Sequence, residues 1–363
     1  MPEKEIKLTR GVPPTESFPI HRLADCATTA LEQFGPEVLQ YGPAGGFRPL
    51  QEMLAAQAGV SPDRVIIGQG SLLLQDFLAR LMLHPGDLAF VENPTYDRTI
   101  LSLRRPGSTV EGIPMEPDGM AVDVLEARLR SGARPVLLYS IPDFQNPTGS
   151  VLSEEKRRRV VELAETYNFW VVEDVPYRQL RYRGTDVPSF FDLAPQRTLQ
   201  MSSFSKLIGP GLRVGYLILP DALAKRFLDF VEEAYICPTY LVQAMVYDFA
   251  RRGWLKENIG FLKSLYPPRL EAILGALDEH FCELGSWIRP EGGFFIGLTL
   301  RRPVTQPELG RLARQSGLWI LDGRDFHTDG SGGSFIRLPF TALSPDDLRE
   351  GIARLAKVVR QAS

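Results

Sequence analysis

The stretch SSFSKLIGPGLRVGY, residues 202–216, places a single lysine, Lys206, among hydroxyl side chains and just before a Gly-Pro-Gly turn. Arg213 follows seven residues later. Apolar runs with the pattern of strands lie on both sides, RTLQMSS at 197–203 and RVGYLILP at 213–220. A lysine reacts as a nucleophile near neutral pH only when it is desolvated or covalently captured. The stretch is therefore a candidate reactive site, although a solvated surface lysine is the more ordinary interpretation of Lys206 alone.

Further apolar runs alternate with helical patterns upstream of this stretch. The runs are RVIIG (64–68), DLAFVEN (87–93), PVLLYSIP (135–142) and FWVVEDV (169–175). Strands that are apolar throughout and separated by helices are typical of a largely parallel sheet covered on both faces, so we predict an α/β fold. In such sheets ligands bind beyond the carboxyl ends of the strands. The chain places polar residues at those ends: Gly70, Ser71, Asn93, Tyr96, Asn146, Asp174, Tyr177 and Ser203 to Lys206.

The pattern changes after about residue 250, where helical segments are followed by GGFFIGLTL and SFIRLPF and a final helix from Ser344. This order is typical of an α+β domain. We expect an N-terminal segment, 1–40, that is too short to fold alone and packs on the small domain. A large domain at 41–250 and a small C-terminal domain at 251–363 complete the chain. Pro267-Pro268 should interrupt what otherwise reads as one long helix.

Composition excludes several classes of protein. The 363 residues exceed what one core usually holds, and the net charge of −3 predicts neither nucleic-acid nor membrane binding. No run approaches the ~18 apolar residues of a membrane helix, and the N-terminus has no signal-peptide core. Cys26, Cys237 and Cys282 are few, odd in number and far apart, which predicts no disulfide and no metal site. A reducing cytoplasm is the expected location.

Lys206 and Asp174 together meet two needs of one cofactor, pyridoxal 5'-phosphate. Its aldehyde captures a lysine, and its ring nitrogen needs a carboxylate beside it, so that the protonated ring draws electrons from a substrate carbon. Asp174 ends the run FWVVED, where such a carboxylate belongs. A strand-end acid that faces water is the more ordinary interpretation of Asp174 alone.

The remaining needs of this cofactor are a phosphate cup, partners for the ring oxygen and an aromatic platform. Gly70-Ser71 follows a strand and opens a helix, where backbone N–H groups and the helix dipole attract phosphate. Ser203, Ser205 and Arg213 could close that cup. Tyr96 could stack on the ring, and Asn146 and Tyr177 could bond its oxygen. Each also has an ordinary reading, as an N-cap, a core tyrosine or a plain turn.

Taken together, the motifs resemble one family. The blocks are YGPAGGFRPLQEMLA (41–55), FQNPTG (144–149), VEDVPY (172–177), residues 202–216 and SFIRLPF (334–340). They are similar to those of the fold-type-I pyridoxal-phosphate enzymes, class I/II aminotransferases. The likeness is greatest to 2-aminoadipate aminotransferases and to the aminotransferase-like domains of MocR regulators, from about Ile6 to the C-terminus. It implies a mostly parallel central sheet in the large domain plus a smaller α+β domain.

The resemblance implies a role for each site residue. The catalytic residues would be Lys206, which binds the cofactor and carries the substrate proton, Asp174 on the ring nitrogen, and Tyr96 on the ring. Substrate would be bound by Arg337, which grips the α-carboxylate, with Gly11 and Asn146. The residues implied to bind the cofactor are Gly70, Ser71, Leu72, Tyr96, Asn146, Asp174, Tyr177, Ser203, Ser205, Lys206, Arg213 and Tyr41.

The resemblance has further implications for Tyr41 and Leu72. Tyr41 resembles a tyrosine that reaches the phosphate in a neighbouring subunit, which implies a homodimer with shared active sites. Leu72 departs from the Gln or Ala usual in the family and offers only its backbone N–H.

Arg22 and Arg324 could receive an acidic substrate side chain, although surface positions are the more ordinary interpretation. The loop RGVPPTESF (10–18) should pass over the substrate, where Gly11 permits a close approach of the backbone.

The predicted function is an aminotransferase that moves an amino group from an L-amino acid to a 2-oxo acid by a ping-pong mechanism. The family implies 2-oxoglutarate as the acceptor. A β-lyase, decarboxylase or oxidase on the same scaffold is the first alternative, because the same ring electronics serve all of them. A ligand-sensing domain of a regulator is the second. It is disfavoured because the residues before Tyr41 are neither basic nor helix-turn-helix-like.

Overall fold

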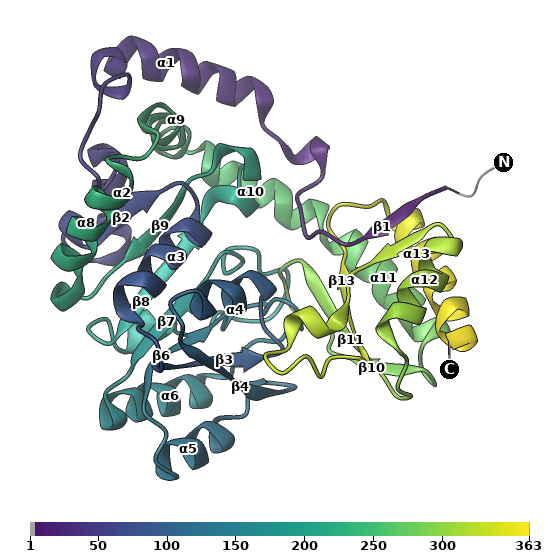
Figure 1. Ribbon diagram of the computed structural model, residues 1–363. Coiled ribbons are helices and arrows are strands. Elements are labelled where there is room, and N and C mark those ends of the chain that lie inside the picture. The colour runs from purple at the N-terminus through teal and green to yellow at the C-terminus, as the bar shows by residue number, and fades with distance from the viewer. Residues whose placement is uncertain (1–3, 363) are drawn as a thin grey trace.

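The computed structural model describes residues 4–362. An eight-stranded sheet forms the centre of its larger part (Figure 1). β8, β7, β6, β3 and β4 run parallel, whereas β9 and β5 are antiparallel to their neighbours. The predicted α/β fold with a mostly parallel sheet is therefore confirmed. The strands, in order across the sheet, are β2 (Val65–Gly68), β9 (Gly215–Ile218), β8 (Thr198–Ser203), β7 (Trp170–Asp174), β6 (Pro135–Ser140), β3 (Leu88–Asn93), β4 (Thr109–Glu116) and β5 (Gly119–Met120).

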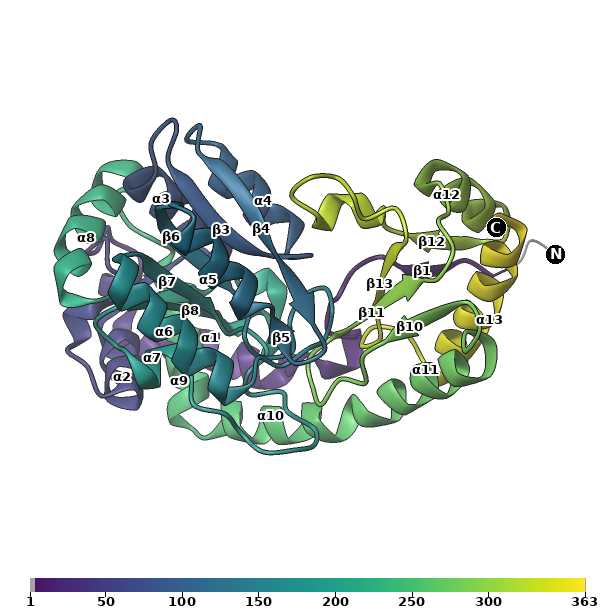
Figure 2. The same ribbon diagram turned by 90° about the horizontal axis from the view of Figure 1, so that it is seen from below.

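Both faces of the parallel strands are buried, because successive side chains of a strand point to opposite faces. Phe90, Leu138 and Val171 pack together on one face. Helices α5 and α6 cover that face (Figure 2). Tyr139 and Val172 belong to the main core on the other face, which carries the site described below. The helices of this part are α2 (Arg48–Ala58), α3 (Ser71–Met82), α4 (Asp97–Arg104), α5 (Val122–Arg130), α6 (Glu154–Tyr167), α7 (Phe190–Leu193), α8 (Asp221–Tyr235) and α9 (Tyr240–Arg251).

The small domain holds an antiparallel sheet of three strands, in the order β10-β11-β13. A short parallel pair, β1 and β12, lies beside it. The α+β pattern predicted for the C-terminal part is present. Its elements are β10 (Gly285–Trp287), β11 (Phe295–Leu300), β12 (Leu318–Ile320), β13 (Phe335–Pro339), α11 (Pro267–His280), α12 (Gln306–Gln315) and α13 (Pro345–Ala362).

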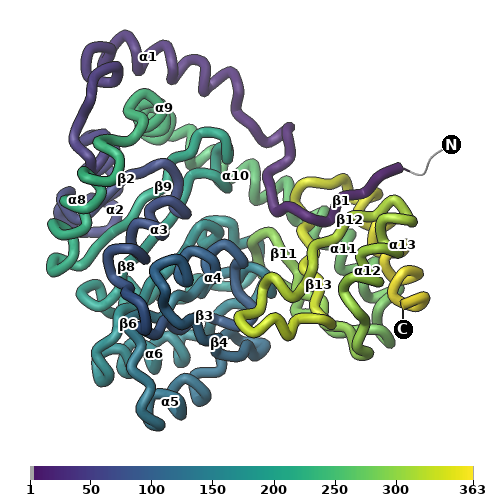
Figure 3. Tube along the Cα trace, viewed as in Figure 1, coloured from purple at the N-terminus to yellow at the C-terminus, as the bar shows by residue number. Residues whose placement is uncertain are grey.

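The N-terminal segment is shared between the two domains, which corrects the expectation that all of residues 1–40 pack on the small one. β1 (Ile6–Leu8) does pair with β12 in the small domain. Helix α1 (Ile20–Val38) instead runs along α9 of the large domain, as the trace in Figure 3 shows. Arg251 of α9 donates to Gln33 at 2.9 Å. The buried residues Cys26 and Ala30 lie on the inner side of α1, so the apolar face of this helix packs against α9.

Two helices join the domains end to end. α10 (Trp254–Leu265) stops at Tyr266, and α11 begins at Pro267 (Figure 2). The predicted break at Pro267-Pro268 is confirmed, because a proline lacks the N–H of a helix interior but suits the first turn. Within residues 4–362, every helix is too short or too polar to span a lipid bilayer.

Candidate active site

A cavity of about 530 Å³ opens between the domains, beyond the carboxyl ends of β6, β7 and β8. Three parts of the chain wall it: the segment after β1, the large-domain sheet edge, and the small domain. A larger, more open groove of about 900 Å³ elsewhere contains none of the predicted site residues. The predicted residues that line the smaller cavity are Gly11, Ser71, Leu72, Tyr96, Asn146, Asp174, Tyr177, Ser203, Ser205, Lys206, Arg213 and Arg337.

Lys206 ends a 3-10 helix that follows β8 directly. Its Nζ donates to the backbone oxygen of Gly11 at 2.8 Å and lies 5.4 Å from the centre of the Phe294 ring. Burial, helped by the charges of Arg337 and Arg213, lowers the pKa of Lys206 to about 8. A substantial fraction of the amine is therefore neutral near pH 8, which is the form that acts as nucleophile or base.

Asp174 is the last residue of β7 and lies on the cavity face of the sheet. Its Oδ2 accepts a hydrogen bond from the Tyr139 hydroxyl at 2.7 Å. Its Oδ1 is buried and has no hydrogen-bond partner within residues 4–362. Burial raises the pKa of this carboxyl to about 7. A buried polar atom without a partner costs free energy, so Oδ1 is suited to a donor supplied by a ligand.

An anion-binding corner lies at the start of helix α3. Gly70 has φ of 89°, and a Cβ added there would lie 2.3 Å from Arg213 Nη2. Glycine suits this position, because its φ is positive and the Arg213 guanidinium lies in the space that a Cβ would take. Ser71 opens α3, and the Ser203 and Ser205 hydroxyls lie 2.8 Å apart in the same cavity wall. Free N–H groups, a helix dipole and a guanidinium together favour a phosphate.

Arg337 of β13 extends from the small domain into the cavity. Its two terminal nitrogens donate to Asn146 Oδ1 and to the Thr9 backbone oxygen, each at 2.9 Å. Its guanidinium lies between the rings of Phe295 and Phe326, 4.6 and 4.7 Å from their centres. Its Nε is buried and has no partner among the described residues. The guanidinium is thus held in place while its Nε–H is left unpaired, which suits a planar carboxylate.

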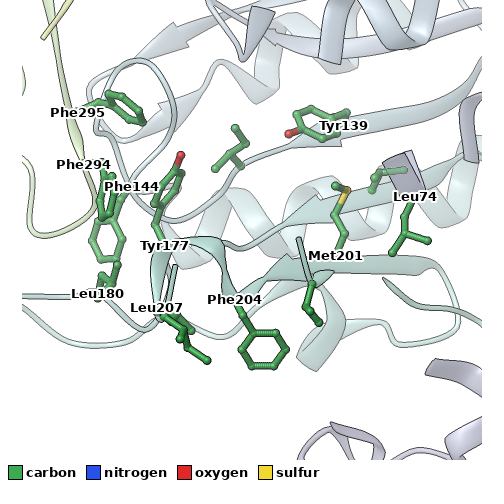
Figure 4. Close-up of a cluster of buried hydrophobic side chains, with 14 of the residues drawn as sticks. Leu74, Tyr139, Phe144, Tyr177, Leu180, Met201, Phe204, Leu207, Phe294 and Phe295 are labelled. Atoms are coloured by element: carbon green, nitrogen blue, oxygen red, sulfur yellow. The ribbon is translucent and has the colours of Figure 1, made fainter. Parts of the chain in front are cut away.

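Aromatic side chains complete the wall. Tyr177 stands beside Phe294 and Phe295, with ring centres 5.5 and 5.9 Å apart (Figure 4). Burial raises the pKa of Tyr177 and that of Tyr96, so both keep their hydroxyl protons at neutral pH. Both can therefore donate hydrogen bonds into the cavity.

This arrangement of lysine, carboxylate, anion corner and arginine agrees with a comparison of the sequence with protein families. The sequence model of aminotransferase class I and II matches residues 3–355. The chain belongs to this family. The aromatic-amino-acid aminotransferase 1 of Thermococcus litoralis is 30% identical, over 98% of this chain and 88% of its own length. The 2-aminoadipate transaminase of Thermus thermophilus is 31% identical, over 96% and 89%.

The solved structures agree. The α-aminoadipate aminotransferase of Thermus thermophilus, complexed with N-(5'-phosphopyridoxyl)-L-leucine, superposes on this aminotransferase with a TM-score of 0.94 at 29% identity. The match covers 99% of this chain and 93% of that one. In sequence, the protein named probable rhizopine catabolism regulatory protein MocR of Rhizobium meliloti also matches, at 29% identity over 84% of this chain and 62% of its own length. The predicted family resemblance is thus confirmed.

Some predicted residues of the aminotransferase lie outside the cavity. Gly70 is behind Arg213 rather than in the wall. Tyr41 is 75% exposed, and its role across a dimer stays a prediction. Arg22 pairs with Glu257 at 2.7 Å, and Arg324 pairs with Asp322 at 2.6 Å. Neither arginine lines the cavity, which favours the surface interpretation for both.

Other residues in or behind the wall were missed by the sequence reasoning. Phe295 and Phe326 enclose Arg337, and Asp97 and Arg98 also line the cavity. The Tyr139 side chain lies outside the cavity lining, and its hydroxyl donates a hydrogen bond to Asp174. The one available signal was the polar hydroxyl of Tyr139 within the apolar run PVLLYSIP, because a buried hydroxyl needs a partner.

Proposed function

We propose that this aminotransferase moves an amino group from an L-amino acid to 2-oxoglutarate, with pyridoxal 5'-phosphate bound in the 530 Å³ cavity. The observation that carries the proposal is Asp174 Oδ1, a buried acceptor without a partner in the wall that also holds Lys206. A carboxylate buried in this way is costly unless a cationic N–H donor is brought to it. A protonated pyridine ring is such a donor.

The residues present fit this cofactor. Asp174 would hold the ring nitrogen, Asn146 and Tyr177 the ring oxygen, and Tyr96 a face of the ring. Gly70, Ser71, Ser203, Ser205 and Arg213 would hold the phosphate. When bound, the cofactor supplies an aldehyde that accepts the amino group and a ring that withdraws electrons from the substrate α-carbon.

Lys206 performs the proton transfer in this proposal. Its amine is buried and has a pKa of about 8, so its neutral form is available to take the proton from the substrate α-carbon. The guanidinium of Arg337 binds the α-carboxylate and so fixes which way the amino acid lies. The segment that carries Thr9 and Gly11 lines the same cavity, where it would limit the entry of water.

The donor side chain and the assembly are further parts of the proposal. The named relatives act on aromatic amino acids and on 2-aminoadipate, and both remain candidate donors for this chain. We also propose a homodimer, because Tyr41 and its neighbour Leu39 are strongly exposed, at 75% and 73%. A cytoplasmic location stays the expectation from the cysteine content.

The test is a half-reaction screen. The protein is loaded with pyridoxal phosphate, each amino acid is added without an acceptor, and the absorbance of the bound cofactor is followed. We expect some amino acids to convert it to the pyridoxamine form and 2-oxoglutarate to restore it. Release of pyruvate or ammonia without a keto acid would show a lyase instead. Binding without conversion would show a sensing domain.

A second measurement locates the bond to the cofactor. Borohydride reduction followed by peptide mapping should place the label on Lys206, and Lys206→Ala should abolish both the absorbance and turnover. A label on another lysine would overturn the proposal.

A further inference from the structure

A row of buried polar side chains leads from helix α3 to Asp174. The Thr99 hydroxyl of α4 donates to Gln75 Oε1 of α3 at 3.4 Å, and it also lies close enough to the Tyr139 hydroxyl on β6 to lower the pKa of that group. The Tyr139 hydroxyl in turn donates to Asp174 Oδ2 at 2.7 Å. Gln75, Thr99 and Tyr139 are at most 2% exposed. Polar groups this deep cost free energy unless they are paired. We therefore expect these side chains to support the carboxylate of Asp174, which lies at the end of the row.

We propose that Tyr139 is a positioning residue, which keeps Asp174 ionised and turns its Oδ1 toward the cavity, and that Thr99 orients the Tyr139 hydroxyl. The inference rests on the proposed function, since it gives Asp174 the ring nitrogen as its partner. It assigns this second layer of the site to residues whose side chains do not line the cavity.

The strand register places Tyr139 correctly for this task. Tyr139 of β6 is paired with Val172 of β7, so Asp174, two residues further along, is its diagonal neighbour on the same face. Figure 4 shows the Tyr139 ring in the buried cluster beside the sheet. Because Tyr139 occupies Oδ2, only Oδ1 is left for a ligand. The hydroxyl thereby leaves Oδ1 as the oxygen available to the cofactor in this proposal.

The electrostatics give the direction of the effect. Burial raises the pKa of Asp174 and the hydrogen bond from Tyr139 lowers it, while the charge of Glu92 raises it and that of Lys206 lowers it. Tyr96 and Tyr177 also lie near the carboxyl. The pKa of Tyr139 itself is raised well above its ordinary value, so it stays a donor. A carboxylate with a lower pKa leaves the shared proton on the ring nitrogen, whereas loss of the hydroxyl moves that proton toward Asp174.

Tyr139→Phe is the direct test, because it removes the hydroxyl and keeps the ring. The matched control is Tyr182→Phe, which deletes a hydroxyl that donates to the Gly293 oxygen at 2.7 Å, outside the cavity. The holoenzyme is loaded with cofactor labelled with ¹⁵N in the ring, and its chemical shift is titrated. We expect the ring nitrogen of Tyr139→Phe to lose its proton at least about one pH unit lower than in the wild type, with kcat reduced about tenfold and KM little changed. Tyr182→Phe should match the wild type.

A second titration separates this inference from the proposed function. In the full-length apoprotein with ¹³C-labelled aspartate, the Asp174 signal, assigned by its loss in Asp174→Asn, should titrate at higher pH in Tyr139→Phe than in the wild type. This readout needs no cofactor, so it tests the inference even if the ring nitrogen is bound elsewhere.

Unchanged titrations of both the ring nitrogen and Asp174 in Tyr139→Phe would overturn the proposal. If that variant does not fold, Thr99→Val replaces it, because a weakened donor at Tyr139 should shift both titrations in the same direction by a smaller amount. No shift in Thr99→Val would then overturn it.

Discussion

Asp174 shows, at the scale of one residue, how function and stability oppose each other. The buried position that suits Asp174 to a cationic ligand also opposes its ionisation, so its pKa lies near 7 rather than at its ordinary 3.8. A carboxyl whose folded pKa is raised supports the fold fully below about pH 4 and loses that contribution as the pH rises to about 7. Ionisation of this buried carboxyl at physiological pH therefore lowers the stability of the apoprotein.

Asp174→Asn should stabilise the apoprotein, because the amide has the same shape and no charge. The expected gain in the free energy of unfolding is on the order of 2 kcal/mol at pH 8 and smaller at pH 5. Chemical denaturation at the two pH values measures it, and activity should be lost. An equal or lower stability at pH 8 would show that the buried carboxylate is already compensated.

Gly70 offers a second prediction at this scale. Gly70→Ala must adopt a φ of 89° and push its Cβ against Arg213. We expect the dissociation constant for pyridoxal phosphate to rise at least about tenfold, with a loss of about 1 kcal/mol in stability. Gly86→Ala is the matched control, since Gly86 has a φ of 92° and open space around it. It should lose similar stability and keep its cofactor affinity; a similar loss of affinity in both variants would contradict the prediction.

The segment between β1 and α1 is the element that closes the site. Its backbone oxygens at Thr9, Gly11 and Val12 accept hydrogen bonds from Arg337, Lys206 and Thr341, respectively. Three attachments, to both domains, hold this segment across the cavity. Its position, rather than any side chain of its own, brings it against the proposed substrate site.

Gly11→Ala should therefore disturb the segment. A Cβ at Gly11 would lie 2.1 Å from the Phe295 ring, which is itself stacked on Arg337. We expect KM for the amino acid to rise at least about fivefold with a smaller change in cofactor affinity, as steady-state kinetics and a cofactor titration would show. Gly275→Ala, in open space on α11, is the control and should leave both unchanged. An unchanged KM in Gly11→Ala would mean that the segment moves away freely.

At the scale of the whole molecule, the prediction concerns the proposed dimer. If Tyr41 of one subunit completes the site of its neighbour, Tyr41→Ala and Lys206→Ala each inactivate or weaken the enzyme by damaging different halves of one site. Mixing the two variants after dissociation should restore part of the activity, because one site of each mixed dimer then has both native residues. The measurement is activity after remixing, with sedimentation to confirm the dimer.

Activity that stays at the level of the separate variants, in dimers shown to have exchanged subunits, would place Tyr41 outside the neighbouring site. A monomer in sedimentation would contradict the shared site altogether.

The α/β fold, the break at Pro267 and the family could all be predicted from the sequence. Strand periodicity, helix-breaking residues and motifs such as 202–216 are local in the chain, so they can be read without knowing any contact. The sequence also indicated which polar residues gather beyond the strands, since the carboxyl ends of parallel strands share one edge of the sheet.

Other features became clear only from the three-dimensional structure. It divided the N-terminal segment between two domains, placed Gly11 on Lys206, set Arg337 between two phenylalanines, and showed Tyr139 behind Asp174. Each of these depends on a contact between side chains far apart in the chain, and apolar patterning specifies that such residues are buried without specifying against what. The physical reason is that burial is a property of each residue, whereas a hydrogen bond or a stacked ring depends on how whole elements pack.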